Sequence, residues 1–392
     1  MRTLPWDYGV RNLARSRTRL MLSVFGSALV VLLVLAAGAF VRGMNRSLGS
    51  SGGERNVILL GAGSEESFER SEIQPSVPGL VLASVRGIKQ RLGTPYVSPE
   101  VFFMTMLKLD PADAGAGHQV MLRGVTPAAF LVHSQVHVVD GRVPDAGRDE
   151  LIVGSLAATK MGLPEERLAV GQKISFDNRP WTIVGKFEAP GTVMEAEVWT
   201  PLSDLQIAAR RDNLSCVVLT LDSASGAEIE DVDAFARQRL DLELVAISEK
   251  AYYAKLNAFF RPIQLIVWAT AMLIATGGLL GGLNTMYAAF ASRVREVGSL
   301  QALGFPRYAI VFSLIQESVL ATAAGALIGA ATALVALNGV HVRFSMGVFG
   351  LVIDSPVLAA GLCAGLLLGV LGALPPAWRC LRLPISQALK AF

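Results

Sequence analysis

Four long apolar runs dominate the pattern of hydrophobic and polar residues along the chain. Each is close to or longer than the roughly 20 residues that an α-helix needs to cross a bilayer. The only charged residue inside them is one carboxylate in the third run. The predicted spans are residues 20–41, 262–290, 308–337 and 356–374. The pattern therefore predicts an α-helical membrane protein with four transmembrane helices.

The long segment between the first two spans, residues 42–261, has a different pattern. Short runs of alternating or apolar residues are separated by turns, which is typical of strands, and a few longer amphipathic runs indicate helices. We expect a large inserted mixed α/β extracytoplasmic domain in two lobes. Predicted strands are residues 56–60, 101–109, 119–125, 131–139, 150–153, 173–176, 179–184, 197–200 and 215–221, and predicted helices are residues 77–91, 155–161, 227–240 and 248–261.

The last of these helices leads directly into the second span, with Ser248 as its expected N-cap. We therefore expect the second span to continue outward as a stalk under the external domain. The glycine- and serine-rich residues 49–53, which follow the first span, are expected to form a loop.

A short basic segment, SRVREVGSLQALGFPR at residues 292–307, separates the second and third spans. Read as a helix, it carries an apolar stripe of Val294, Val297, Leu300 and Leu303, because these residues are three apart and the helical period is 3.6. Two interpretations remain open from the pattern: a helix that docks on another protein, or a simple turn between spans.

The distribution of charge sets the orientation. The 392 residues are 52% hydrophobic and only 17% charged, against about a quarter charged in soluble chains. Residues 1–19 carry five arginines against one acid, residues 291–307 three against one, and residues 375–392 three basic residues and no acid. The loop at residues 338–355, which is expected to be external, has one positive and one negative side chain and so no net charge. The positive-inside rule therefore places both termini and the 291–307 loop in the cytoplasm.

Two further features of the N-terminal region bear on how it meets the membrane. Residues 1–19 have the pattern of an amphipathic segment on the inner face of the membrane. Residues 37–39, Ala-Gly-Ala, resemble a signal-peptide cleavage site, but the apolar run is longer than that of a signal peptide, so we expect the segment to be retained. The net charge of +3 is too small to indicate nucleic-acid binding.

Small residues recur four apart within three of the spans. This spacing lets helix backbones approach closely, although glycine is also common in membrane helices generally. The expected packing positions are Gly277, Gly281, Gly325, Gly329, Gly361 and Gly365.

Glu317 is the ionisable residue within the third span, roughly 14 Å along the helix from its cytoplasmic end. Burial of a carboxylate there is costly, which favours a functional or structural partner. We favour a hydrogen bond within the bundle, for example to Asn284, over a proton relay, because the spans contain no second acid or histidine.

Most enzymatic chemistry is disfavoured. No G-x-x-x-x-G-K-[ST] or H-E-x-x-H motif occurs, and the three cysteines match no metal-ligand spacing. His133 and His137 would lie about 13 Å apart on the strand predicted there, so a metal site is not expected. The G-x-S-x-G match at residues 49–53 lacks the strand-turn-helix context of a nucleophile elbow. We expect no catalytic, metal or cofactor site.

Several motifs carry a family resemblance. RVREVG at residues 293–298, followed by QALG at 301–304, resembles the signature of the FtsX-like and MacB-like permeases of ABC transporters. RNLAR at 11–15, Glu317 with Gly325 and Gly329, and residues 171–185 are also similar to elements of that family. The tail, PPAWR at 375–379 and LPISQAL at 383–389, matches more loosely.

The resemblance implies a permease of a bacterial inner membrane that works as a homodimer or paired permease, with a separate ATP-binding subunit that holds ATP and Mg. A periplasmic adaptor (membrane fusion) protein is a further implied partner. The loop after span two would be a coupling helix that docks on the ATP-binding subunit. By position, that role falls to Arg295, Glu296, Leu300, Leu303 and Gly304.

Two functional hypotheses follow from the resemblance. The first is a membrane subunit that couples ATP hydrolysis in its partner to motion of the external domain, for export or extraction of an unknown substrate. The alternative is an FtsX-like signalling or scaffold protein that uses the same motion to activate an extracytoplasmic hydrolase.

Overall fold

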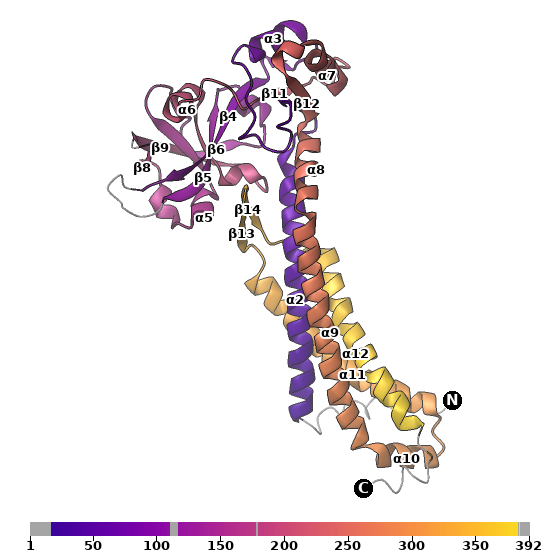
Figure 1. Ribbon diagram of the computed structural model, residues 1–392. Coiled ribbons are helices and arrows are strands. Elements are labelled where there is room, and N and C mark those ends of the chain that lie inside the picture. The colour runs from indigo at the N-terminus through magenta and orange to yellow at the C-terminus, as the bar shows by residue number, and fades with distance from the viewer. Residues whose placement is uncertain (1–16, 110–116, 178, 383, 385–392) are drawn as a thin grey trace. The chain divides into compact units, whose positions relative to one another are not determined.

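The computed structural model describes residues 17–109, 117–177, 179–382 and 384, which form two compact units (Figure 1). We call Met1–Gly43, Pro262–Val340 and Leu351–Phe392 the membrane unit. Met44–Arg261 and His341–Gly350 form the α/β unit.

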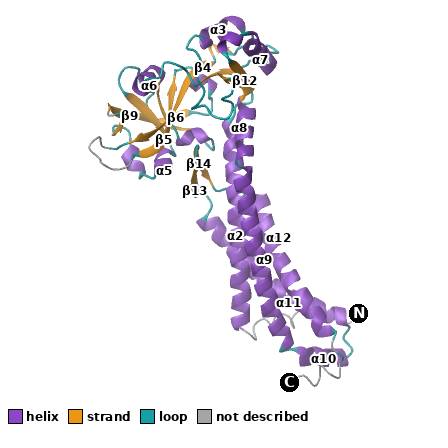
Figure 2. Ribbon diagram, in the orientation of Figure 1, coloured by secondary structure: helices purple, strands orange, loops and turns teal. Residues whose placement is uncertain are grey.

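Four helices of the described chain are long and apolar enough to cross a membrane, in agreement with the four predicted spans (Figure 2). These are α2 (Arg17–Ser51), α9 (Arg261–Ala291), α11 (Arg307–Ala336) and α12 (Ser355–Leu381). A short helix, α10 (Val294–Ala302), lies between α9 and α11 in the chain. The predicted N-terminal amphipathic segment lies largely outside the described residues.

Two helices extend beyond the predicted spans. The loop predicted at residues 49–53 is wrong at its start, because α2 continues to Ser51. The hydroxyls of Ser50 and Ser51 donate to carbonyls one turn back, Arg46 O at 2.8 Å and Ser47 O at 2.7 Å, so these polar residues are satisfied within the helix. At the other end of the chain, α12 continues through Pro375 and Pro376, where the sequence predicts an end.

The core of the membrane unit has two parts. In one, Val31 and Leu35 of α2 pack against Ala326, Ala330 and Ala333 of α11. The other joins α9, α10, α11 and α12, and its buried members are Met286, Phe290, Val297, Ile310, Leu314, Ala373, Ala377 and Leu381. We call this second group the end cluster. By contrast, only 6% of the most apolar window of α9 is buried, against 39% for α11.

The α/β unit is built on a ten-stranded mixed sheet with the strand order β12-β1-β11-β4-β5-β10-β7-β9-β6, with β8 paired to β9. The strands are β1 (Asn56–Gly61), β4 (Val97–Leu107), β5 (His118–Val125), β6 (His137–Gly141), β7 (Glu150–Gly154), β8 (Lys173–Phe176), β9 (Arg179–Glu188), β10 (Val198–Pro201), β11 (Cys216–Thr220) and β12 (Leu244–Ser248). A small separate ribbon pairs β2 (Gln90–Arg91) with β3 (Thr94–Pro95).

Strand β4 joins the two halves of this sheet. Its first residues, Val97 to Glu100, pair with β11, and Val101 to Leu107 pair with β5. The helices of the unit are α3 (Val77–Ser84), α4 (Ala129–Val132), α5 (Ala157–Met161), α6 (Leu202–Ala209), α7 (Ile229–Gln238) and α8 (Glu249–Phe259). The fold class is therefore the predicted one: four transmembrane helices with an inserted mixed α/β domain.

Several local predictions in this unit are wrong. The strand predicted at residues 131–139 contains the end of α4 before β6 begins, and the helix predicted at 77–91 ends at Ser84, ahead of Gly87 with its positive φ of 78°. Helix α6 and strand β12 are not predicted at all. The N-cap prediction is confirmed, since the Ser248 hydroxyl accepts a hydrogen bond from Ala251 N at 3.1 Å.

The loop between α11 and α12 forms a hairpin of β13 (His341–Phe344) and β14 (Gly347–Gly350) that belongs to the α/β unit. The Lys160 ammonium of α5 donates to the carbonyl oxygens of Phe344 and Ser345, the latter at 2.9 Å. These bonds hold the hairpin to α5 within the α/β unit.

Candidate functional site at the end of the helix bundle

Helix α10 folds with one side against its own chain. Val294 and Val297 are buried, and Leu300 is half-buried against the end cluster. The predicted apolar stripe is therefore not a free docking surface at Val294 and Val297, because both side chains are buried and Val297 is part of the end cluster.

The end of α10 depends on Gly304. Its amide donates to Gln301 O at 3.0 Å, and the following amide, of Phe305, donates to Leu300 O at 3.1 Å. This pair of bonds is the Schellman motif, which requires a left-handed residue after the C-cap. Gly304 has φ of 86°, a conformation that glycine adopts without strain. Leu300 and Phe305, which both pack against the end cluster, supply the apolar contact that accompanies the motif.

Glu317 forms a buried ion-pair cluster with two arginines. Its side chain is only 5% exposed. One carboxylate oxygen accepts from Arg19 of α2, and the other accepts from Arg293 Nη1 at 2.8 Å. Arg293 Nε in turn donates to Glu296 of α10 at 3.0 Å. We call Arg19, Arg293, Glu296 and Glu317 the arginine clamp; it ties α2, α10 and α11 together.

The predicted partner of Glu317 is wrong. Asn284 is exposed on α9, and the carboxylate is satisfied by arginines instead. The charge pattern alone assigns Arg19 and Arg293 only to the cytoplasmic side of the spans. Long arginine side chains near the ends of spans reach several ångströms along a helix, and this reach is the signal that could have identified them.

Three of the five residues expected to couple to a partner are exposed. These are Arg295 of α10 and the two residues that follow its end, Leu303 and Gly304; Leu303 is 67% exposed. Glu296 is partly exposed and holds Arg293, while Leu300 packs inward. The surface available to a partner is thus the C-terminal end of α10 together with Arg295. We call Arg295, Leu303 and Gly304 the α10 exposed face.

The expected packing glycines divide into two groups. A Cβ at Gly325 or Gly329 would lie 2.2 Å from Val24 O or 2.4 Å from Ala28 O of α2, so these glycines allow the two helices to touch. Gly361 and Gly365 of α12 are similarly crowded by Leu35 of α2 and by Ala326 of α11 and Val31 of α2.

Gly277 and Gly281 of α9 differ from the other four. A Cβ on either would meet no atom within 4 Å in this single chain. Gly281 lines a crevice of about 280 Å³ among α2, α9, α11 and α12. The structure therefore places these two glycines outside the close helix contacts of the chain.

A second ionic cluster is buried in the α/β unit. Arg123 of β5 donates to Glu197 at 2.8 Å and to Glu100 of β4 at 3.3 Å. The other Glu100 oxygen lies 2.7 Å from His133 Nε2. His133 Nδ1 lies 3.7 Å from Glu249, the first residue of α8. All five side chains are 5% exposed or less.

Neighbouring groups complete this cluster. Arg123 lies over the rings of Phe102 and Trp199, at 4.3 and 5.1 Å from their centroids. Glu249 accepts from Asn56 of β1 at 2.8 Å and from Gly53 N at 2.7 Å. The cluster therefore fixes the start of α8 to strands from both halves of the sheet.

Burial and charge oppose each other in this cluster. Burial alone would raise the pKa of Glu100 and lower the pKa of His133. Their mutual attraction, together with Arg123 beside Glu100 and Glu249 beside His133, outweighs burial, so the pKa of Glu100 is lowered and the pKa of His133 is raised. For Glu197 burial prevails and its pKa is raised, despite the opposing effect of Arg123.

His133 and His137 do not form a metal site, since His133 is buried in this cluster and His137 is exposed. Across the described ranges, no group of three or more His, Cys, Asp or Glu side chains is placed to hold a metal ion.

Two family profiles together match most of the chain. The MacB-like periplasmic core domain matches residues 20–237, and the FtsX-like permease C-terminal domain matches residues 268–385. The first match alone covers more than half of the chain and includes most of the inserted α/β domain.

Individual relatives have low sequence identity to this chain, but the matches cover more than half of it. The macrolide export ATP-binding/permease protein MacB of Burkholderia cenocepacia is 24% identical over 401 residues, which cover 98% of this chain and 57% of that protein. MacB of a Shewanella species is 25% identical over 228 residues, 56% of this chain and 35% of that protein. The uncharacterized ABC transporter permease YvrN of Bacillus subtilis is 21% identical over 408 residues, covering 95% of this chain and 96% of YvrN.

The chain thus spans only part of the MacB proteins that it matches, and nearly all of YvrN. The four spans, the inserted domain and the two profile matches agree on one assignment. This chain belongs to the FtsX-like permeases with a MacB-like periplasmic core domain, and it is a permease component of an ABC transporter.

Proposed function

We propose that this chain couples ATP hydrolysis in a separate nucleotide-binding subunit to motion of its α/β domain, for export or extraction of a substrate. The observation that carries the proposal is the geometry of α10. This helix is anchored by the arginine clamp and the end cluster, while the residues of the α10 exposed face, Arg295, Leu303 and Gly304, are exposed.

A mechanical route from α10 supports this proposal. The arginine clamp ties α10 to α2. Helix α2 continues to Ser51, whose hydroxyl accepts from Val193 N at 2.9 Å within the α/β unit. At the other junction between the membrane helices and the domain, only Phe260 separates α8 from α9. Helix α8 begins at Glu249, which is part of the buried ionic cluster. Both helices that lead into the domain are thus fixed to it by hydrogen bonds.

We further propose that the chain works as a homodimer or paired permease in a bacterial inner membrane, with both termini in the cytoplasm. The apolar and largely unburied α9 supports pairing, since Gly277 and Gly281 leave room for a second helix to approach. A periplasmic adaptor would act on the α/β domain. Mg and ATP belong to the nucleotide-binding subunit in this proposal.

ATPase activity of the reconstituted complex tests the proposal. The full chain and the ATP-binding subunit are assembled in lipid nanodiscs, and hydrolysis is compared with that of the ATP-binding subunit alone. Leu303→Asp and Arg295→Glu should each abolish the stimulation while the permease still inserts. Leu240→Asp, at an 81% exposed leucine of the α/β unit, is the matched control and should leave stimulation intact. Unchanged complex formation and hydrolysis in both α10 variants would overturn the proposal.

A further inference from the structure

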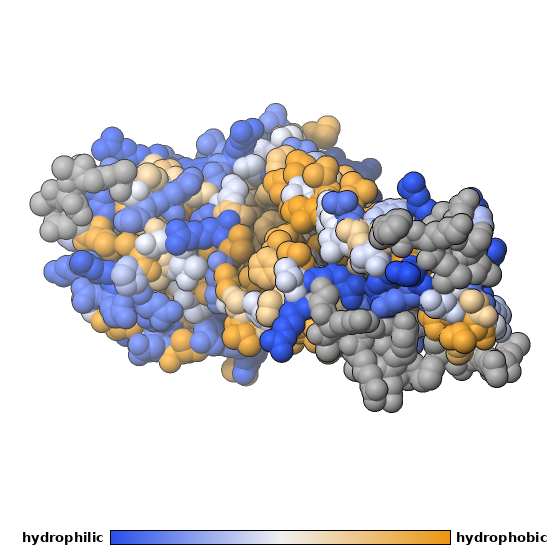
Figure 3. Space-filling model, turned by 90° about the horizontal axis from the view of Figure 1, so that it is seen from below, coloured by the Kyte–Doolittle hydropathy of each residue, from blue (hydrophilic) through white to orange (hydrophobic). Residues whose placement is uncertain are grey.

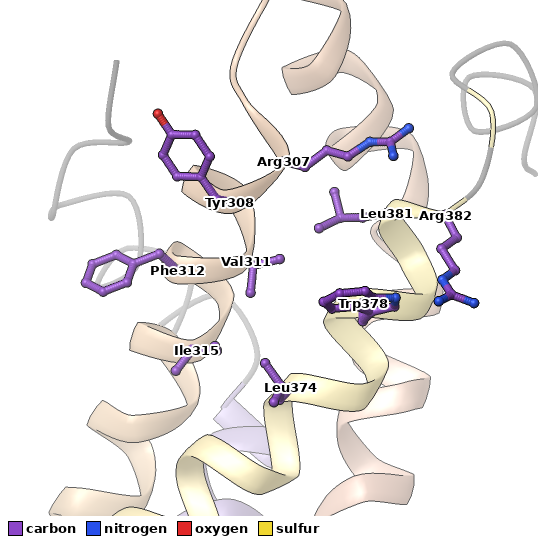
Figure 4. A pocket seen from close by; sticks show the side chains of 9 residues that line it. All are labelled: Arg307, Tyr308, Val311, Phe312, Ile315, Leu374, Trp378, Leu381 and Arg382. Carbon is purple, nitrogen blue, oxygen red and sulfur yellow. The ribbon is translucent and has the colours of Figure 1, made fainter. Parts of the chain in front are cut away.

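An open groove of about 520 Å³ lies between α11 and α12 in the membrane unit, a volume within the range of small-ligand sites (Figure 4). Val311 of α11 and Trp378 of α12 point toward one another across it, and Ile315 and Leu374 line its inner part. Arg307, the first residue of α11, and Arg382, just past the end of α12, lie at the same end.

The groove combines an apolar wall with a cationic mouth. Ile315 lies eight residues along α11 from Arg307, which is about 12 Å of helix. The Arg382 guanidinium lies over the Trp378 ring at 5.7 Å, and no carboxylate is among the described lining residues. Trp378 and Tyr308 are 58% and 57% exposed, as expected of aromatic residues at a membrane–water boundary.

The surface around this end of the helices has the same mixed character. Seen from below, hydrophobic surface lies directly beside hydrophilic surface (Figure 3). Such a mixture, with arginines at the rim of an apolar groove between helices, is the chemistry that binds a phosphate headgroup and its acyl chain.

Charge argues against two occupants that this chain could itself supply, a second copy and the terminal segments. A second copy placed about a two-fold axis through the groove would bring four guanidinium groups together with no acid among the described lining residues. Residues 1–16 carry three arginines and one aspartate, and residues 385–392 carry one lysine and no acidic side chain, so neither terminal segment complements the mouth by its side-chain charge.

We propose that this groove binds one anionic phospholipid of the cytoplasmic leaflet. The phosphate lies between Arg307 and Arg382, and an acyl chain lies along Val311, Ile315 and Leu374. The ligand is separate from the transported substrate, and the site is separate from the α10 exposed face.

Native mass spectrometry of the full chain in detergent, titrated with dioleoyl-phosphatidylglycerol or dioleoyl-phosphatidylcholine, tests this site. Wild type should hold one phosphatidylglycerol more tightly than phosphatidylcholine. The double variant Arg307→Gln/Arg382→Gln should lose this preference, with an affinity loss of about fivefold for each guanidinium removed. The control, Arg17→Gln/Arg379→Gln, removes two exposed arginines outside the groove and should bind as wild type does.

A second measurement does not depend on these charge variants. Benzoyl-phenylalanine placed at position 311, in chain reconstituted into vesicles of phosphatidylglycerol and phosphatidylcholine in equal amounts, should yield a photoadduct with the mass of phosphatidylglycerol. Equal affinity of the groove and control double variants would overturn the proposal. So would a crosslink from position 311 to a second copy, to the terminal segments or to no lipid at all.

Discussion

Glu317→Gln is the substitution that tests the arginine clamp most sharply. It keeps the shape and one acceptor oxygen but removes the charge shared by Arg19 and Arg293, whose side chains are each 14% exposed. Removing one partner of a buried ion pair costs about 3–5 kcal/mol, because the remaining charge is left uncompensated. Arg293 retains Glu296 and the glutamine retains a hydrogen bond, so we expect a loss of about 2–3 kcal/mol.

The matched control is Glu296→Gln. It removes a second carboxylate from the same arginine, but this side chain is 39% exposed, and partly exposed pairs contribute less than about 1 kcal/mol. The two variants therefore remove the same charge from one cluster, but Glu317 is more deeply buried and pairs with two arginines, so its loss should cost more.

Thiol labelling provides the assay. Cys380 packs partly buried against the end cluster, so its reaction rate in mixed micelles with increasing SDS reports the opening of that cluster. The exposed Cys363 is first replaced by serine. Glu317→Gln should shift the opening free energy by the stated amount, and Arg19→Gln should then cost little more. A shift below about 0.5 kcal/mol in Glu317→Gln, or a larger one in Glu296→Gln, would refute this account of the clamp.

Four further substitutions test three separate features. Gly329→Val should destabilise the α2–α11 contact by about 1–3 kcal/mol in the same assay, whereas Gly277→Val should have little effect. Gly304→Ala should cost about 1 kcal/mol through its positive φ; equal stability would contradict the Schellman role. Glu100 raises the pKa of His133 above its ordinary 6.5 against the effect of burial. The stability contributed by protonated His133 is thus full below pH 6.5 and is lost as pH rises through the pKa of His133 in the folded protein. Tm should therefore fall as the pH is raised, and His133→Phe should reduce this dependence of Tm on pH.

The membrane unit was predicted well from the sequence because each span carries its own signal. Twenty apolar residues without charge specify a transmembrane helix whatever surrounds them. The ends of the helices were predicted less well. Serine hydroxyls that bond within α2, and prolines that remain within α12, extend both helices past residues that usually end one.

The side-chain clusters could not be predicted, since their members are remote in the chain. Glu317 is 298 residues from Arg19 and 24 from Arg293. Likewise, Arg123 and Glu100 lie within strands, where a charged residue normally marks a solvent-facing position, yet here they face each other in the core. The interruption of the apolar run at Arg123 was the available signal, but it does not identify the partner.

The stripe on α10 illustrates the same limit. Periodicity correctly predicted an amphipathic helix, but it could not say whether the apolar side faced a partner or the chain itself. Packing assigns Val297 to the interior and leaves Leu303 outside. Docking therefore rests on fewer residues than the stripe contains.

Photocrosslinking from α10 tests the central claim most directly. Benzoyl-phenylalanine at position 303, in the full chain co-expressed with the ATP-binding subunit, should crosslink to that subunit. The same probe at position 335, an 87% exposed residue near the opposite end of α11, should not. Crosslinking from position 303 to lipid or to nothing, with the two subunits still co-purifying, would contradict docking through α10.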